Sequence, residues 1–303
     1  MKKTMYALSI LFLLISICFA PVWANAYSLD ALDYNAIIFG DFSAMNSDVE
    51  GRLAVGGTAT LQNYSVGSRL STLELADNND TLIVGGDLSY TNGQVWGNAL
   101  VGGTATSGFN TLGGTLSHGL GALYIFSTAK TNFENLSTTL GQETANGTTV
   151  NNWGSLVLTG DGTSARQIFS VDGTELLNAN GISISDIPEN ASVVINVSGD
   201  TSGLTNMGMQ SLESIRSNLL FNFYETTALT MSGIGVQGSI LAPFADVDAN
   251  NGQLNGMIVA DSWDGTMELH NVPFEGQVVP VPGTMSLLSF GLLCFSGMAR
   301  RKV

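Results

Sequence analysis

Cysteine is almost missing from this chain of 303 residues, and its two copies lie near the ends. Cys18 belongs to an apolar N-terminal run and Cys294 to an apolar C-terminal one, so residues 27–277 contain none. That segment can form no disulfide and no cysteine-based metal site or nucleophile. It must be held together by its own hydrophobic core, and about 250 residues are enough to build one.

Basic residues are also scarce, with ten Lys and Arg against 25 Asp and Glu. Half of them lie in the two end segments: Lys2, Lys3, Arg300, Arg301 and Lys302. Residues 27–277 therefore carry five basic residues against all 25 acids, a net charge of −20. Such a charge repels nucleic acids and anionic lipid surfaces. We therefore exclude DNA and RNA as partners.

Histidine occurs only at positions 118 and 270. Without cysteine, these two residues leave no metal site of the His/Cys kind. The sequence also lacks a G-x-S-x-G elbow and a P-loop. We interpret His270 as a histidine whose hydrogen bonds are satisfied within the fold. We predict a protein that is not an enzyme, with no catalytic, cofactor-binding or metal-ligating residues and no cofactor.

Carboxylates are the remaining side chains that could support catalysis or bind a cation. Asp246 and Asp248 lie two residues apart, so on a strand both side chains point to one face, and Asp261 and Asp264 follow closely. Paired acids of this kind act as general acid and base in enzymes that cleave polysaccharides, and their oxygens can bind Ca²⁺. A solvated acidic rim is the interpretation that we favour. A carboxylate-dependent polysaccharide hydrolase or lyase is the alternative function.

The N-terminus has the three regions of a secretory signal peptide. Lys2-Lys3 precede an apolar run over residues 5–19, and Ala24-Asn25-Ala26 supplies the small residues of a cleavage site. This order is typical of exported proteins. We expect signal peptidase to remove residues 1–26, so that the mature chain begins at Tyr27.

The C-terminus contains an uncharged apolar run over residues 283–299. As a helix it would be about 26 Å long, which is near the lower limit for crossing a bilayer. Arg300-Arg301-Lys302 follow at once, and basic residues just past a span mark its cytoplasmic end. We expect this transmembrane segment to hold the chain at the membrane, with its bulk outside, until the tail is processed.

Between the ends, short apolar runs alternate with Gly, Asn, Ser and Thr, which predicts an all-β domain. A Gly-centred frame occurs at Gly51, Gly97, Gly238 and Gly256, and a Val-Gly-Gly frame begins at Val55, Val84 and Val101. The step from Gly238 to Gly256 nearly equals the step from Val84 to Val101, as successive coils of a β-solenoid require. We predict a right-handed β-solenoid, or β-helix, whose coils stack to bury their apolar sides.

One segment departs from the β pattern. Apolar residues recur there at helical spacing: Phe126, Ala129, Phe133, Leu136 and Leu140. This stripe predicts an amphipathic helix over residues 121–140 that packs along the solenoid. The larger aromatic residues elsewhere could stack on a sugar, although core packing is the favoured interpretation for most of them: Tyr90, Trp96, Trp153, Tyr224 and Trp263.

Several stretches resemble the choice-of-anchor A family of bacterial adhesins. They read YNAIIFGD at 34–41, EGRLAVGG at 50–57, and NLLFNF, GVQGSILAP and NGQLNG within 218–256. The resemblance spans nearly the whole of residues 27–277. It implies a β-helical fold similar to ice-binding-like adhesive domains. It also implies a place on the envelope or in the biofilm matrix of a Gram-negative bacterium.

The tail over residues 278–303 is similar to the Pro-Glu-Pro sorting signal called PEP-CTERM. Pro280 and Pro282 precede the apolar span and the basic stop, although Val281 stands where that signal has Glu. The resemblance implies an exosortase-like transpeptidase as a partner. We therefore expect a non-enzymatic surface or matrix adhesin that is sorted through its tail, with extracellular polysaccharide or other surface proteins as ligands.

Overall fold

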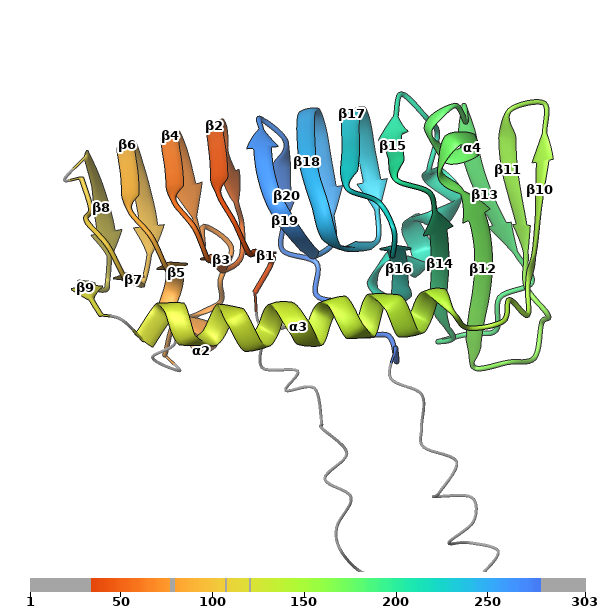
Figure 1. The fold of residues 1–303 in the computed structure, drawn as a ribbon, viewed down its shortest axis with the longest axis horizontal. Helices are drawn as coiled ribbons and strands as arrows, with labels where there is room; N and C mark the ends of the chain where they lie inside the picture. Colours follow the sequence, from red (N-terminus) through yellow and green to blue (C-terminus); the bar gives the residue numbers. More distant parts are fainter. Residues whose placement is uncertain (1–33, 77–79, 107, 120, 279–303) are drawn as a thin grey trace, which may run out of the picture. The chain divides into compact units, whose positions relative to one another are not determined.

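The computed structural model describes residues 34–76, 80–106, 108–119 and 121–278 (Figure 1). The chain divides into two compact units, residues 1–31 and residues 32–303. All described residues belong to the second unit, and the fold is given for that unit alone. No helix in the described ranges is long and apolar enough to cross a membrane. The expected signal peptide and the expected span over residues 283–299 lie outside these ranges.

Strands dominate the described residues, which confirms the predicted all-β class. The first of two long parallel ladders consists, in spatial order, of β12 (Arg166–Asp172), β14 (Ser192–Ser198), β16 (Leu219–Phe223), β18 (Ser239–Asn255), β19 (Ile258–Gly265), β1 (Ala36–Ile38), β3 (Leu53–Val55), β5 (Asp80–Val84), β7 (Asn98–Val101) and β9 (Leu116–His118). Every pairing within it is parallel, which is how neighbouring turns of a winding chain meet.

The second ladder shares β18 and β19 with the first, because these long strands bend from one side of the stack to the next. Its other members are β15 (Thr201–Thr205), β17 (Ala228–Gln237), β2 (Phe42–Val49), β4 (Ala59–Val66), β6 (Leu88–Trp96) and β8 (Gly108–Leu112). The short β20 (Glu268–His270) pairs with both β18 and β2.

A smaller sheet and four helical segments complete the described elements. The sheet contains β10 (Thr148–Asn152), β11 (Ser155–Thr159) and β13 (Gly181–Ser185). The helices are α2 (Thr72–Ala76), α3 (Gly121–Gly141), α4 (Gly173–Leu177) and the 3-10 helix η2 (Gln210–Asn218).

The chain does not build the ladders from one end to the other. It begins with β1 and β2 in the middle of the stack and winds outward to β8 and β9 (Figure 1). The helix α3 then runs back along the stack, and the chain winds inward from β10 until β19 and β20 pair with β1 and β2. We call this meeting of the first and last strands the seam.

The Gly-centred frames occupy equivalent places on the first ladder. Gly238 and Gly256 stack on neighbouring turns as predicted, because a Cβ on Gly256 would lie 2.2 Å from the carbonyl oxygen of Gly238. The Val-Gly-Gly frames also stack, Gly102 on Gly85 and Gly85 on Gly56. At these positions the backbones approach too closely for any side chain.

The step between turns varies in length. Ile240 pairs with Ile258 and Phe42 pairs with Ala59, and both steps have the length that the repeated frames predict. Ala59 pairs with Leu88, which is a longer step because that turn also contains α2. The turns that contain α4 and η2 are likewise longer, as the pairings of β12 with β14 and of β14 with β16 show. Helical insertions therefore lengthen single turns without breaking the ladders.

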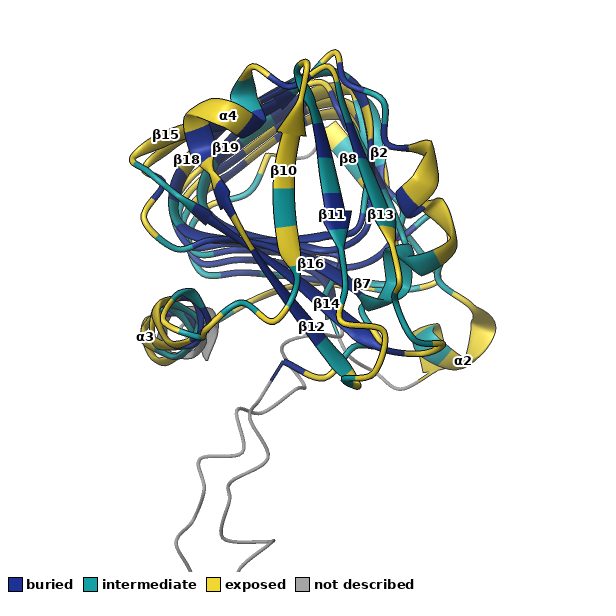
Figure 2. Ribbon diagram, turned by 90° about the vertical axis from the view of Figure 1, so that its right-hand side faces the viewer, coloured by how far each residue is buried: buried dark blue, intermediate teal, exposed yellow. Residues whose placement is uncertain are grey.

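Inward-facing side chains of the ladders form one hydrophobic core (Figure 2). Outward positions are largely exposed on the second ladder, as in β4 and β6, but buried on much of the first, as in β1, β14 and β16. The predicted helix is confirmed as α3, which ends one residue later than expected. Its stripe packs on the stack: Phe126, Leu136 and Leu140 are buried, and Ala129 and Phe133 are half-buried.

Candidate functional site

A row of asparagine amides marks the bend of β2, β4 and β6. Asn46, Asn63 and Asn92 all have positive φ values, of 55°, 49° and 54°, a conformation that Asn tolerates better than most residues. Asn63 Nδ2 donates to Asn46 Oδ1 at 2.8 Å, and Asn92 Nδ2 donates to Asn63 Oδ1 at 2.7 Å. All three side chains are exposed. The row therefore presents aligned amides to solvent.

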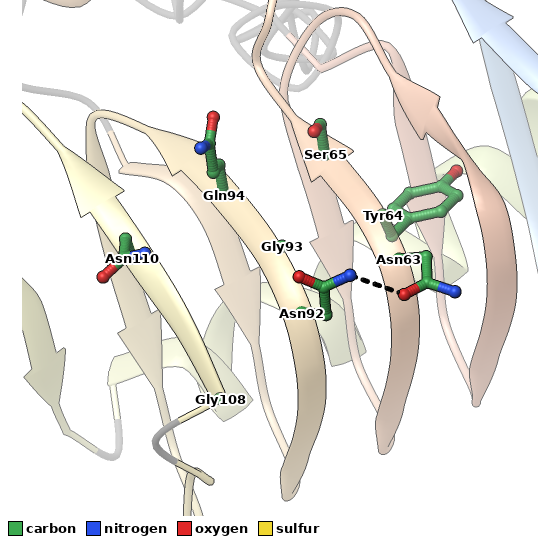
Figure 3. Close-up of a pocket in the computed structure, with 8 residues that line it drawn as sticks. All are labelled: Asn63, Tyr64, Ser65, Asn92, Gly93, Gln94, Gly108 and Asn110. Atoms are coloured by element: carbon green, nitrogen blue, oxygen red, sulfur yellow. Dashed lines mark hydrogen bonds between the residues drawn. The ribbon is translucent and has the colours of Figure 1, made fainter.

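An open groove of about 420 Å³ lies beside this row, over β4, β6 and β8 (Figure 3). Its lining residues are Asn63, Tyr64, Ser65, Asn92, Gly93, Gln94, Gly108 and Asn110. Ser65 pairs with Gln94 and Gln94 pairs with Asn110 along the ladder. These three side chains thus form a second polar row parallel to the asparagine row.

The groove holds hydrogen-bonding groups and almost no titratable ones. Tyr64 is the one lining residue that ionises, and its side chain is buried beneath the groove with its ring 6.1 Å from that of Phe42. Burial raises the pKa of Tyr64 well above its usual value, so it stays neutral. The groove can bind a polar ligand, but it offers no carboxylate or imidazole for acid–base chemistry.

The four predicted acidic residues lie elsewhere, on β18 and β19. Asp248 and Asp264 are directly paired across these strands, and Asp246 accepts a hydrogen bond of 2.5 Å from Ser262. Asp261 instead forms an ion pair with Lys130 of α3 at 2.5 Å. The structure thus brings Asp246, Asp248 and Asp264 onto one exposed strand surface and places Asp261 at its edge beside the helix.

The aromatic residues do not form one platform. Tyr90 and Trp263 are buried in the core, and Tyr224 is half-buried. Trp96 is partly exposed at the end of β6. Trp153, at the turn between β10 and β11, is 96% exposed and has a positive φ of 54°. Core packing is therefore the role of Tyr90 and Trp263.

The structure also brings together residues that no sequence pattern connects. Glu50, Glu268 and His270 offer one ligand atom each, and these atoms all lie within 4.8 Å of one another. Glu50 is far from the other two in the sequence, and the pairing of β2 with β20 at Val49 and Leu269 brings it close. Composition excludes a His/Cys metal site, but it does not reveal one histidine beside two carboxylates that only the fold brings together. The predicted cleavage and sorting residues, Ala24, Ala26, Pro280, Pro282 and the basic stop, lie outside the described residues.

A family model described as "Putative Ice-binding-like adhesive domain" matches residues 28–271. The chain belongs to this family. No curated protein and no solved structure matches the chain. The match covers both long ladders, α3 and the groove, so the whole described stack is the adhesive domain.

Membership of this adhesive-domain family indicates a surface or extracellular adhesin. It favours a non-enzymatic role, which agrees with a groove lined by amides and a hydroxyl group. The lining of the groove thus offers mainly groups that donate and accept hydrogen bonds.

Proposed function

We propose that this adhesive domain binds a neutral, hydroxyl-rich polymer, such as an extracellular polysaccharide, in the groove over β4, β6 and β8. The observation that carries this proposal is the pair of parallel polar rows, one ending at Asn92 and one formed by Ser65, Gln94 and Asn110. Amides both donate and accept hydrogen bonds, as sugar hydroxyls do.

The periodicity of the ladder suits a repeating ligand. Neighbouring strands lie about 4.8 Å apart, so equivalent side chains recur at that spacing. Asn63 and Asn92 are held in place by their own hydrogen bonds and backbone conformation. A rigid, preorganised row loses little conformational entropy on binding, which raises affinity without a deep pocket.

Binding to a panel of polysaccharides tests the groove. The double substitution Gln94→Ala with Asn110→Ala should weaken binding about tenfold, since two lost hydrogen bonds at about 0.7 kcal/mol each amount to that factor. Gln62→Ala is the matched control, because Gln62 is an exposed amide of β4 outside the groove lining. Equal affinity for the double variant and the control would place the binding surface elsewhere.

The alternative, a polysaccharide hydrolase or lyase, rests on the direct pairing of Asp248 with Asp264. Incubation of the protein with acidic and neutral polysaccharides distinguishes the two functions. Binding without new reducing ends or unsaturated products supports the adhesin. Turnover that disappears in Asp248→Asn or Asp264→Asn would establish the enzyme instead.

We further propose that the protein is a choice-of-anchor A adhesin and that its strands form a right-handed β-solenoid. It is exported by a signal peptide that ends at Ala26 and sorted by an exosortase-like enzyme through a PEP-CTERM-like tail. Its place is the envelope surface or matrix of a Gram-negative bacterium. The start of the adhesive-domain match at residue 28 agrees with cleavage after Ala26, because the expected mature chain begins at Tyr27.

Maturation is tested by the intact mass of the surface-exposed protein from native cells. We expect a mass that lacks residues 1–26 and the hydrophobic end. Replacement of Arg300, Arg301 and Lys302 by Ser should cause mis-sorting, because the basic stop fixes the orientation of the span. A surface form that still contains residues 283–303 would show a simple membrane anchor instead.

A further inference from the structure

We infer that Glu50, Glu268 and His270 form a binding site for a divalent transition-metal cation, with Zn²⁺ as its natural probe. The site lies at the seam, where the first long strand of the domain meets its last short one. It is separate from the groove and from the acidic surface of β18 and β19. It would add a metal-binding function to the adhesive domain.

The backbone arranges these three side chains. Glu268 and His270 are two residues apart on β20, so their side chains lie on one face. Glu50 directly follows β2, and its N–H donates to the carbonyl of Leu269 at 2.9 Å. This bond fixes Glu50 beside the two ligands of β20. The three ligand atoms therefore converge through regular strand pairing rather than through a loose loop.

The ring of His270 is oriented by a second residue. Its Nδ1 lies 2.8 Å from Oδ1 of Asn255, a buried side chain. The Nδ2 of Asn255 donates to the carbonyl of Val236 at 3.1 Å, so the amide oxygen must be the atom that faces the ring. The Nδ1 atom of His270 therefore carries a proton. A histidine that ligates a metal commonly donates its other ring N–H in this way.

The remaining ring nitrogen faces a carboxylate. Nε2 of His270 lies 3.3 Å from Oε2 of Glu268. With Nδ1 protonated, a neutral ring would set its Nε2 lone pair against a carboxylate oxygen, so a positive charge belongs between them. Two ligands of a tetrahedral ion at about 2.1 Å each lie about 3.4 Å apart. The observed separation of this pair is close to that value, and the Glu50 ligand atom lies within 4.8 Å of both.

The neighbouring charges favour a cation. Glu50 has two partners that orient it, Arg69 Nε at 3.3 Å and the backbone N–H of Asn271 at 3.0 Å. The two carboxylates of Glu50 and Glu268 with the one guanidinium of Arg69 leave a net negative charge for the cation to neutralise.

The donor set identifies the class of metal. Zn²⁺ and its transition-metal neighbours accept both imidazole nitrogen and carboxylate oxygen, whereas Ca²⁺ and Mg²⁺ prefer oxygen alone. Bound metal would join Glu50 to β20 and so hold the two ends of the domain together. A ligand that binds only the folded state raises its stability.

The test uses the full chain, purified in mild detergent through a tag without histidine and stripped of metal by a chelator. Calorimetric titration with ZnCl₂ at pH 7.5 should show one site per chain, and Zn²⁺ should raise the melting temperature. His270→Gln and Glu268→Gln should each weaken binding at least tenfold. His118→Gln is the matched control, because His118 is the other histidine of the chain and lies on β9, and it should leave binding unchanged.

Two results would overturn the inference. One is equal Zn²⁺ binding by His270→Gln and His118→Gln, which would show a site without His270. The other is no Zn²⁺ binding, together with NMR detection of protons on both ring nitrogens of His270 at pH 7.5. In that case an imidazolium–carboxylate ion pair supplies the positive charge. Glu268 is the more exposed ligand, so Glu268→Gln keeps the test valid if His270→Gln does not fold.

Discussion

Ser137 Oγ donates a hydrogen bond of 2.6 Å to Oδ1 of Asn222, and both side chains are fully buried. Asn222 Nδ2 donates in turn to the carbonyl of Ser137 and to Oδ1 of Asn196, which itself donates to the carbonyl of Leu140. Two stacked asparagines of β14 and β16 thus fasten the last turns of α3 to the first ladder. Apolar packing alone would not fix the position of the helix along the stack.

Removing the Asn222 amide should therefore destabilise the domain. In Asn222→Ala the Ser137 hydroxyl and the Asn196 oxygen lose a partner in a buried place, which costs about 1–3 kcal/mol in the free energy of unfolding. Denaturant unfolding measures the difference. Asn152→Ala, at an exposed amide on β10, should change stability by less than about 0.5 kcal/mol. Similar losses in both variants would contradict the role of Asn222.

Gly256→Ala should be strongly destabilising. Its Cβ would lie 2.2 Å from the carbonyl oxygen of Gly238 and 2.5 Å from the carbonyl carbon, and both are backbone atoms that the ladder holds in place. Gly235→Ala on β17 is the control, because its Cβ would meet no atom closer than 3.7 Å. Thermal unfolding of both variants should show a large loss for the first and little change for the second. Equal melting temperatures would contradict the stacking of the Gly frames.

Trp263→Phe should change the free energy of unfolding only slightly. The Trp263 ring stacks on Phe42 across the seam with 6.0 Å between centroids, but its buried Nε1 has no hydrogen-bond partner among the described residues. Phe keeps most of the packing and removes that unsatisfied donor, so we expect the free energy of unfolding to change by less than about 1 kcal/mol. Trp263→Ala should cost about 3–5 kcal/mol through the cavity that it leaves. Comparable losses in the two variants would show that the indole N–H contributes to stability.

Asp161 should add to stability above pH 4 and lose that contribution in acid. Hydrogen bonds from the side chains of Gln167 and Ser164, and from the N–H groups of Ser164 and Thr163, lower the pKa of its carboxyl group. A lowered folded-state pKa stabilises the fold above the unfolded value of about 3.9, and the effect disappears as pH falls through the folded value.

Unfolding measured between pH 2 and pH 6 tests this dependence. Asp161→Asn should be less stable than the parent near pH 6, and the gap should narrow toward pH 2. Glu189→Gln, at an exposed acid, is the control and should leave the pH profile unchanged. A constant gap across the range would mean that the Asp161 charge is not the cause.

Local patterns in the sequence were enough to predict the all-β class, the long helix and the repeated glycine frames. The stripe from Phe126 to Leu140 requires a helix with one apolar side, and α3 has it. Gly238 and Gly256 recur at the length of one turn, because a turn without an insertion needs about that many residues. These features depend on neighbouring residues or on a fixed repeat, so they can be read along the chain.

The tertiary structure alone decided which turns are neighbours. No pattern predicts that β1 enters between β19 and β3, because every turn of a parallel ladder presents similar backbone groups to either side. Glu50 therefore meets His270 only because the chain starts in the middle of the stack and returns to it. The groove has the same origin, since Asn63, Asn92 and Asn110 lie on different turns. Their approach depends on strand register, which long-range pairing sets and local sequence does not encode.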